Sequence, residues 1–391
     1  MQTNIYKKQL DEACDKFRSI LESQLVRVED IKSQGDFVDY ASLDTVRIGV
    51  CGGDGIGPII TSEARRVLEF MLAEEVKMGK VVFDDIEGLT IENRIAKGKA
   101  IPDDVMEKLK ACHIILKGPT TTPQKGSGMP NIESANVAMR KALDLFANIR
   151  PVKVPEEGIN WTIFRENTEG GYAVGSSGFN VTEDLACDFT ITTKQGSERI
   201  AKLAYDYARK NKLDRVSLVT KANVIKTTDG NFLEDCHKVA ESYPEITTDE
   251  WYADIMTAKL VDKKRRSSFK VILCPNLYGD IISDEAAEFQ GGVGTAGCAN
   301  IGKKYAMFEA IHGSAPRMVS EGRAIYADPC SMLRAAVMLL SHIGYQDKAD
   351  KLERALDVCS FEEKKLTVTG RDTGATCKEF ADYVMETLYT L

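Results

Sequence analysis

Long apolar runs are absent from the 391-residue sequence, and without a stretch of about 18 such residues no membrane-spanning helix is expected. The N-terminal segment, MQTNIYKKQLDEAC, also lacks the apolar core of a secretory signal peptide. No internal repeat and no low-complexity segment is present, so the sequence favours an ordinary globular fold. We expect a protein of the cytoplasm that has no membrane partner.

Paired cysteine motifs are absent as well. The sequence holds ten cysteines, but none of them forms a CxxC pair, and they are scattered through apolar runs such as VILCP. This usage is typical of reduced, buried thiols in a cytosolic protein and argues against a disulfide framework or a zinc site. No cysteine lies in a motif that indicates catalysis.

An excess of positive charge is the third absence, since 51 lysines and arginines stand against 59 aspartates and glutamates and give a net charge of −8. An acidic surface repels phosphate backbones and anionic lipids, so we expect no nucleic-acid partner. A small anionic substrate is compatible with this charge because it needs only a local basic pocket.

The chain is long enough for two domains, and its hydrophobic share of 43% is sufficient for a large core. Residues 7–33 place apolar side chains at spacings of three and four, which predicts one long amphipathic helix. Such a helix could pack on the body of the protein or on a second subunit. From Val46 onward, apolar strands alternate with helical patterns, which predicts an α/β fold with a partly parallel sheet.

Two glycine-rich segments come close to the dinucleotide fingerprint G-x-G-x-x-G without meeting its requirements. The first, GGDGIGP, has a proline in place of the last glycine. The second, GVGTAG at 292–297, follows a predicted helix, whereas the Rossmann fingerprint follows a strand. The sequence therefore predicts that any dinucleotide is bound by another architecture.

Asp280 and Asp284 are four residues apart in NLYGDIISDEAAEF, so they lie on one face if that segment is helical. Two carboxylates at this spacing repel each other, and a hard divalent cation would relieve the repulsion by taking oxygen ligands from both. The alternative is a solvated acidic helix start, which the helix dipole favours. On spacing alone, the solvated helix start is the favoured interpretation.

Several basic and polar residues are further candidates for a binding site. Guanidinium groups bind carboxylates through two parallel hydrogen bonds, so three converging arginines would suit a di- or tricarboxylate. Taken singly, each arginine is better explained as a surface cation. The tyrosine, lysine and histidine candidates could likewise be structural residues. The candidates are Arg140, Arg150, Arg165, Tyr172, Lys221 and His312.

Read in order, nine segments between about Val46 and about Ala355 resemble the β-decarboxylating dehydrogenases, the isocitrate and 3-isopropylmalate dehydrogenase family. The segments are GDGIGP, LKGPTTTP, ESANVAMR, ANIRP, FRENTEGGY, VTKAN, NLYGDIISDEAAEF, GGVGTAGCANIG and AIHGSAP. The resemblance implies a three-layer α/β fold that is not a Rossmann fold, with a large and a small domain. It also implies a homodimer whose subunits share each active site, with GFNVTEDLACDFTITT as a dimer-clasp arm.

The implied domain organisation begins with an N-terminal helical extension. The ranges are 1–45 for this extension, 46–138 for the first part of the large domain, 139–281 for the small domain with its clasp arm, and 282–391 for the second part of the large domain.

The resemblance also assigns site residues. In catalysis, Lys221 would belong to the base network and Tyr172 would protonate the enol carbon. The substrate would be held by Ser134, Asn136, Arg140, Arg150 and Arg165. Mg²⁺ or Mn²⁺ would be bound by Asp280 and Asp284, with Asp254 donated by the partner subunit, which would also supply Lys221. The coenzyme, NADP or NAD, would contact Thr122, Asn223, Glu309, His312, Gly313, Ser314, Ala315, Arg317 and Asp328.

The substrate and the coenzyme follow from particular positions in these motifs. Isopropylmalate enzymes resemble one another in having apolar residues where Ser134 and Asn136 stand, and these polar side chains would reward a carboxylate instead. Isocitrate is therefore favoured, with conversion to 2-oxoglutarate and CO₂; a further arginine typical of homoisocitrate enzymes is absent. Arg317 replaces an aspartate of NAD-preferring relatives, and its cation suits the 2′-phosphate of NADP. Met318 and Asp328, however, depart from the usual NADP pattern.

Two other classes of protein are alternatives. Besides 3-isopropylmalate or homoisocitrate oxidation, the chain could be a non-catalytic regulatory subunit of an isocitrate dehydrogenase. Such subunits lose arginine, tyrosine or aspartate positions, all of which are filled here. A protein that only binds carboxylates is the third possibility, and steady NAD(P)H production would eliminate it.

Overall fold

The computed structural model describes residues 6–123, 128–130 and 132–391, so the first five residues of the expected N-terminal extension lie outside it. The chain forms two compact units. Unit 1 combines Met1–Asp36 with Glu157–Ile282, and unit 2 combines Phe37–Glu156 with Ser283–Leu391. The domain boundaries expected from the sequence stay a prediction, because compact units within one chain need not coincide with domains.

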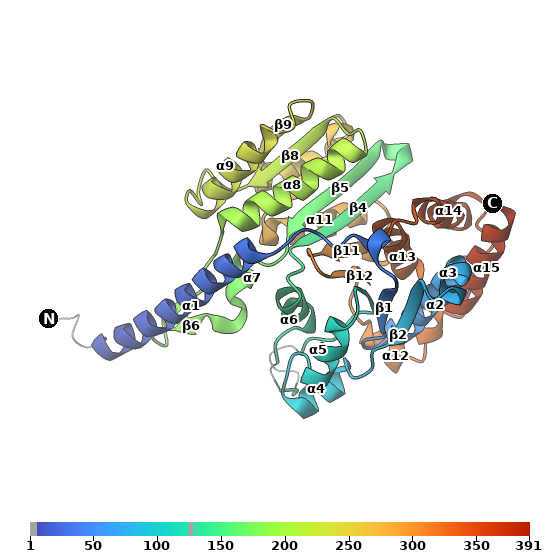
Figure 1. Cartoon of the computed structure of the whole chain (residues 1–391), viewed down its shortest axis with the longest axis horizontal. Coiled ribbons are helices and arrows are strands. Elements are labelled where there is room, and N and C mark those ends of the chain that lie inside the picture. The colour runs from blue at the N-terminus through green and yellow to red at the C-terminus, as the bar shows by residue number, and fades with distance from the viewer. Residues whose placement is uncertain (1–5, 124–127, 131) are drawn as a thin grey trace. The chain divides into compact units, whose positions relative to one another are not determined.

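Unit 1 is built on parallel strands in the order β5-β10-β8-β9, of which β5, β8 and β9 are labelled in Figure 1. The strands are β5 (Ile159–Glu166), β8 (Arg215–Thr220), β9 (Thr247–Tyr252) and β10 (Val271–Cys274). The helices α8 (Lys194–Lys210) and α9 (Thr228–Ala240) pack together on this sheet, and α10 (Ala253–Leu260) follows β9. The helix α8 turns small and apolar side chains, such as Ile200, Ala204 and Ala208, toward the core, which is the period expected of a helix on a sheet.

The predicted helix 7–33 is α1 (Lys7–Ser33), which belongs to unit 1. It runs beside the short antiparallel pair β6 (Phe179–Asn180) and β7 (Ala186–Cys187), within the segment expected to form an arm (Figure 1). The rings of Phe17 and Phe189 join α1 to this segment at 4.8 Å between centroids. Other members of the apolar stripe, including Leu25, remain exposed in the single chain.

Unit 2 contains a mixed sheet in the order β2-β1-β3-β12-β11-β4. Its parallel strands are β1 (Val46–Cys51), β2 (Val81–Asp85), β3 (Ile114–Lys117) and β12 (Ala306–Ala310), while β11 (Gly297–Ile301) runs antiparallel to β12 and to β4 (Ala147–Val154). The helices are α2 (Gly57–Met71), α3 (Ala73–Lys77), α4 (Ile91–Lys97), α5 (Asp103–Lys110), α6 (Ala135–Ala142), α12 (Pro316–Ser320), α13 (Cys330–His342), α14 (Gln346–Asp357) and α15 (Cys377–Thr390).

Helices cover both faces of the unit 2 sheet and give it three layers. Met307 of β12 packs in one core cluster with Leu109 of α5 and Met139 of α6. The next residue, Phe308, points to the opposite face, where its ring lies 5.5 Å from that of His342 in α13. This alternation is the two-residue period of a strand. The predicted α/β, three-layer fold is confirmed.

The structure also confirms that the second glycine motif is not a Rossmann turn. The helix α11 (Asn276–Glu288) precedes Gly292, and the strand β11 follows it, so the order of elements is reversed. Each cysteine is a free thiol in the described chain, and most are buried. Among the residues that the structure describes, no helix combines the length and apolarity needed to cross a membrane.

Candidate active site

In unit 1, Arg165, Tyr172 and Asp280 form one constellation. Arg165 is the next-to-last residue of the buried strand β5 and forms an ion pair with Asp280 of α11. The Tyr172 hydroxyl donates to Oδ2 of Asp280 at 3.1 Å, and the Arg165 guanidinium lies 5.3 Å from the centre of the Tyr172 ring. Three predicted site residues that are up to 115 positions apart in sequence are therefore brought together.

Two neighbours that sequence reasoning missed hold Arg165 in place. The Oδ1 atom of Asn276 accepts hydrogen bonds from Nε and Nη2 of Arg165 at 3.1 and 2.7 Å. Gly279 allows α11 to approach closely, because a Cβ there would lie 2.6 Å from Cγ of Arg165. The signal in the sequence was a polar and a small residue, Asn276 and Gly279, within the four positions before Asp280.

Lys221 and Asp254 form a second constellation in unit 1. Lys221 directly follows β8 and Asp254 lies in the first turn of α10, directly after β9. Since β8 and β9 are parallel, their carboxyl ends meet at one edge, and the Lys221 ammonium hydrogen-bonds the Asp254 carboxylate. This hydrogen bond lowers the pKa of Asp254. Asn223, in the turn after Lys221, is exposed.

In unit 2, a buried ion-pair network surrounds Glu309. Its two carboxylate oxygens bind Nζ of Lys117 at 2.8 Å and Nη2 of Arg140 at 3.2 Å. Burial alone would raise the pKa of Glu309, but the cations Lys117 and Arg140 outweigh it and lower the pKa from 4.5 to about 2. Sequence reasoning missed Lys117, and the role expected for Glu309 in coenzyme binding stays a prediction.

From the lowered pKa of Glu309 we predict that the folded protein loses stability in acid. Its pKa is lower in the folded chain, so its contribution is present above pH 4.5 and is lost as the pH falls toward 2. We expect this group to remove roughly 3 kcal/mol from the free energy of unfolding over that interval, which urea titrations at several pH values would measure. Glu309→Gln should show a shallower fall with pH. An equally steep fall in this variant would contradict the assignment.

The network continues from Glu309 to Arg150 through two buried asparagines. Asn300 donates to Oε1 of Glu309 at 2.9 Å and accepts from Asn148 at 2.8 Å. Asn148 in turn accepts from Nε of Arg150 at 2.7 Å, and Nη1 of Arg150 binds Asp284 at 2.6 Å. The predicted residues Arg140, Arg150 and Asp284 thus belong to one network within unit 2.

The loops after β3 and β12, which are expected to bind the coenzyme, meet the loop after β1 at the carboxyl ends of these parallel strands, the edge where α/β sheets bind ligands. Gly55 has a φ of +62°, and a Cβ there would overlap the carbonyl oxygen of Ser314. The Ser314 and Thr121 hydroxyls hydrogen-bond at 2.7 Å, and Asp54 accepts from the Thr121 amide at 2.7 Å. Thr122 follows in the exposed part of this loop.

The HGSAP loop and the segments after it hold the other coenzyme candidates. Nδ1 of His312 lies 2.9 Å from the carbonyl oxygen of Gly313. Ala315 has a φ of +46°, which is strained for a residue other than glycine. Arg317 is exposed and pairs with Glu321. A further candidate, Asp328, has Oδ1 accepting from the Cys330 amide at 2.8 Å, at the start of α13.

The two substrate candidates from ESANVAMR lie at the start of α6. Ser134 occupies the N-cap position, where its side chain makes no capping hydrogen bond. Asn136 accepts a hydrogen bond from the Thr120 hydroxyl at 2.9 Å. Both side chains are partly exposed, so they are accessible to a ligand on the same side as the Thr121 loop.

The carboxylates have the chemistry of a Mg²⁺ or Mn²⁺ site. Asp280, Asp284 and Asp254 offer the oxygen donors that these hard cations prefer. Each is paired with a cation, yet the side chains are 33%, 57% and 60% exposed and so remain accessible from solvent. Within the described part of one chain, no three ligating side chains form a cluster.

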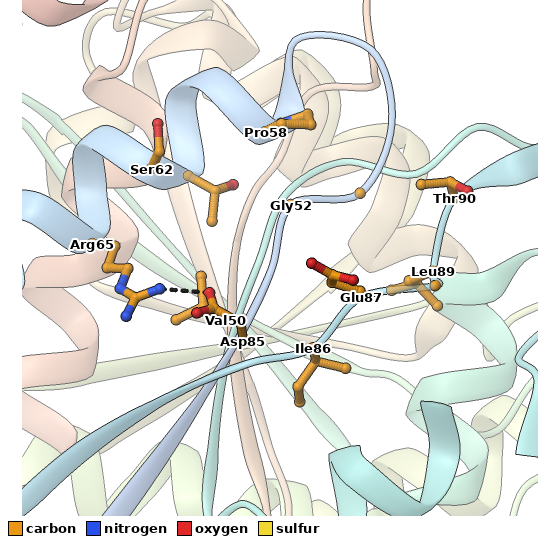
Figure 2. Close-up of a pocket in the computed structure, with 13 residues that line it drawn as sticks. Val50, Gly52, Pro58, Ser62, Arg65, Asp85, Ile86, Glu87, Leu89 and Thr90 are labelled. Carbon is orange, nitrogen blue, oxygen red and sulfur yellow. Dashed lines mark hydrogen bonds and ion pairs between the residues drawn. The ribbon is translucent and has the colours of Figure 1, made fainter. Parts of the chain in front are cut away.

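A separate cavity of about 500 Å³ lies in unit 2 beside the start of α2 (Figure 2). It is lined by residues of the β1–α2 turn and of the segment after β2, including Gly52, Pro58 and Glu87. Arg65 and Asp85 form an ion pair at its wall, as the dashed line in Figure 2 marks. None of the predicted site residues lines this cavity.

The fold and these residues define an α/β protein in which the buried arginines Arg140, Arg150 and Arg165 are each held by a carboxylate. The family model for isocitrate/isopropylmalate dehydrogenase matches residues 47–384. The chain therefore belongs to this family.

The proteins to which the chain is similar are named as dehydrogenases of this family. The isocitrate dehydrogenase [NADP] of Rickettsia prowazekii is 38% identical over 79% of this chain and 62% of its own length. The homoisocitrate dehydrogenase of Methanocaldococcus jannaschii is 34% identical over 88% and 99% of the two chains. The human mitochondrial isocitrate dehydrogenase [NAD] subunit alpha is 35% identical over 85% and 87%. The crystal structure of isocitrate dehydrogenase from Methylococcus capsulatus superposes with a TM-score of 0.76 at 35% identity, covering 88% of this chain and 99% of that one.

Proposed function

We propose that the chain oxidises isocitrate and decarboxylates it to 2-oxoglutarate and CO₂, with reduction of NAD(P) and with Mg²⁺ or Mn²⁺. The observation that carries this proposal is the constellation of Arg165, Tyr172 and Asp280, in which a tyrosine hydroxyl and a buried guanidinium share one carboxylate. A guanidinium can anchor a substrate carboxylate beside a proton donor, and this arrangement suits a decarboxylation in which the product carbon is protonated.

The arginines would bind and orient the substrate. Arg140, Arg150 and Arg165 are each held by carboxylates or amides, so little side-chain freedom is lost when a polyacid binds. Ser134 and Asn136 would hydrogen-bond the carboxylate that distinguishes isocitrate from isopropylmalate.

Lys221 and Tyr172 would move the protons. Lys221, which is paired with Asp254, would belong to the base network that removes the proton of the 2-hydroxyl group as the C2 hydride is transferred. After the bond to the departing carboxylate breaks and CO₂ leaves, the Tyr172 hydroxyl would give its proton to the resulting carbanion carbon. Asp280 orients that hydroxyl.

The bound groups would supply the remaining chemistry. Residues 312–315 would hold the adenosine part of a nicotinamide coenzyme, which would supply the hydride acceptor. Asp280 and Asp284 would hold a divalent cation, which would supply Lewis acidity. We further propose a cytoplasmic homodimer in which the partner subunit donates Asp254 and Lys221. NADP is favoured because the exposed Arg317 cation suits its 2′-phosphate. Among the named relatives, one carries NADP in its name and another carries NAD.

An absorbance assay of NAD(P)H formation at saturating Mg²⁺ tests the function. Crossing isocitrate, isopropylmalate, homoisocitrate and malate with NAD and NADP, we expect the highest kcat/KM for isocitrate with NADP. A preference for isopropylmalate or homoisocitrate would move the chain to a sister activity. Absence of turnover with all of them, together with stimulation of another isocitrate dehydrogenase subunit, would indicate a regulatory subunit instead.

A further inference from the structure

The helix α1 reaches the segment that carries Tyr172. Nη1 of Arg27 lies 3.1 Å from Oε1 of Glu169, and its Nη2 donates to the Thr168 hydroxyl at 3.0 Å. The Glu169 side chain is 4% exposed and that of Arg27 is 22% exposed, so this ion pair is largely shielded from solvent. The family model begins at residue 47, and Arg27 therefore lies outside the part of the chain that defines the family.

Glu169 is buried against the start of α8 as well. Its carboxylate accepts from the Thr193 amide at 2.9 Å, and a Cβ on Gly196 would overlap the same carboxylate. Glu166 lies nearby, and burial together with the charge of Glu169 raises the pKa of Glu166 to about 7. Two acids in this buried position require compensating cations, which Arg27 of α1 and Arg199 of α8 provide.

A short path connects this ion pair to the proposed proton donor. Glu169 directly precedes Gly170, the N-cap of the short helix α7 (Gly171–Val174) that contains Tyr172. The carbonyl oxygen of Glu169 accepts from Nδ2 of Asn276 at 3.2 Å, and Oδ1 of Asn276 holds Arg165. Arg165 is additionally fixed by the pairing of β5 with β10, whereas the glycines before Tyr172 leave its segment dependent on such contacts.

We propose that Arg27 is a positioning residue for the reaction. By binding Glu169 and Thr168, it holds segment 166–172 so that the Tyr172 hydroxyl points at the substrate carbon that is protonated. This inference rests on the proposed function, and it assigns the N-terminal helix a part in catalysis without contact between Arg27 and substrate.

The test compares Arg27→Ala with Arg27→Lys in the full-length protein. We expect Arg27→Ala to lower kcat by about 10- to 100-fold, since small displacements of a reacting group have effects of this size, while KM for isocitrate changes by less than about threefold. Arg27→Lys keeps the ion pair but cannot bind Glu169 and Thr168 together. Its kcat should therefore lie between that of Arg27→Ala and that of the unchanged protein.

Lys32→Ala is the matched control, because Lys32 forms an exposed pair with Glu29 on the same helix. Its kcat should equal that of the unchanged protein. A folded Arg27→Ala protein with unchanged kcat, or with a raised KM as its only defect, would overturn the proposal. If Arg27→Ala does not fold, Arg27→Lys decides, and an unchanged kcat in that variant is the contrary result.

Hydrogen exchange separates this inference from the proposed function. In Arg27→Ala, amides of residues 168–174 should exchange about 10-fold faster or more, because the contacts that close this segment are lost. This measurement needs no substrate, so it remains decisive if the unchanged protein fails to oxidise isocitrate. Unchanged exchange in this segment would show that Arg27 does not hold it.

Discussion

Asp280→Asn is expected to lower kcat with isocitrate by about 10³-fold, and added Mg²⁺ or Mn²⁺ should not restore it. The reason is that one carboxylate has several tasks. It forms an ion pair with the buried guanidinium of Arg165 and accepts a hydrogen bond from the Tyr172 hydroxyl. Under the proposed function it also ligates the divalent cation. Asparagine keeps the shape and one acceptor oxygen but removes the charge. Initial rates over a range of Mn²⁺ concentrations would measure the effect.

Glu288→Gln is the control for this variant, because the substitution makes the same change of charge. Glu288 is exposed and lies at the end of the same helix. It should behave like the unchanged protein. Binding of Mn²⁺, followed by its electron paramagnetic resonance signal, gives a second readout and should be weakened only in Asp280→Asn. Near-normal turnover in Asp280→Asn would refute the assignment of Asp280 to the metal.

Lys117→Met is expected to lower the free energy of unfolding by about 3–5 kcal/mol, the usual cost of removing one partner of a buried ion pair. Lys117 is completely buried, and its ammonium binds Glu309 at 2.8 Å and its neighbour's carbonyl oxygen at 2.9 Å. Methionine would fill similar space, but the Glu309 carboxylate would lose its nearer cation. Urea unfolding, followed by circular dichroism, would measure the change.

Lys99→Met provides the comparison for Lys117→Met. Lys99 forms an exposed pair with Asp103, and such pairs contribute at most about 1 kcal/mol. Its urea midpoint should therefore move only slightly, with an unchanged slope. A loss of less than about 1 kcal/mol in Lys117→Met would mean that the core tolerates Glu309 without its nearer cation, contrary to the buried network described above.

Local patterns were sufficient to predict much of the fold. The helix over 7–33 has the bounds that its periodicity indicated, because its polar ends and apolar spacing are both local properties. The alternation of strands and helices likewise identified an α/β sheet, and the element order around 292–297 excluded a Rossmann turn. What periodicity could not indicate is that much of the apolar stripe of α1, including Leu25, stays exposed in the single chain.

The polar networks could not be predicted in the same way, because they join residues that are distant in sequence. Lys117 and Glu309 are 192 positions apart, and Asn148 and Asn300 are 152 apart. They meet only through strand pairing, such as the register that places Asn300 opposite Asn148. A polar residue inside an apolar strand was the available signal, but it does not identify the partner. The link from Arg27 to Glu169 left no pattern at all in the sequence.

The complete burial of Lys117 gives unit 2 a natural reporter. An amine that solvent does not reach cannot react with acylating reagents while the core is closed, so each labelled Lys117 records one opening of that core. Mass spectrometry of the peptide that contains Lys117 would then follow local opening of the sheet interior over minutes to hours. Exposed lysines such as Lys99 react without such opening and serve as the internal reference for the labelling rate.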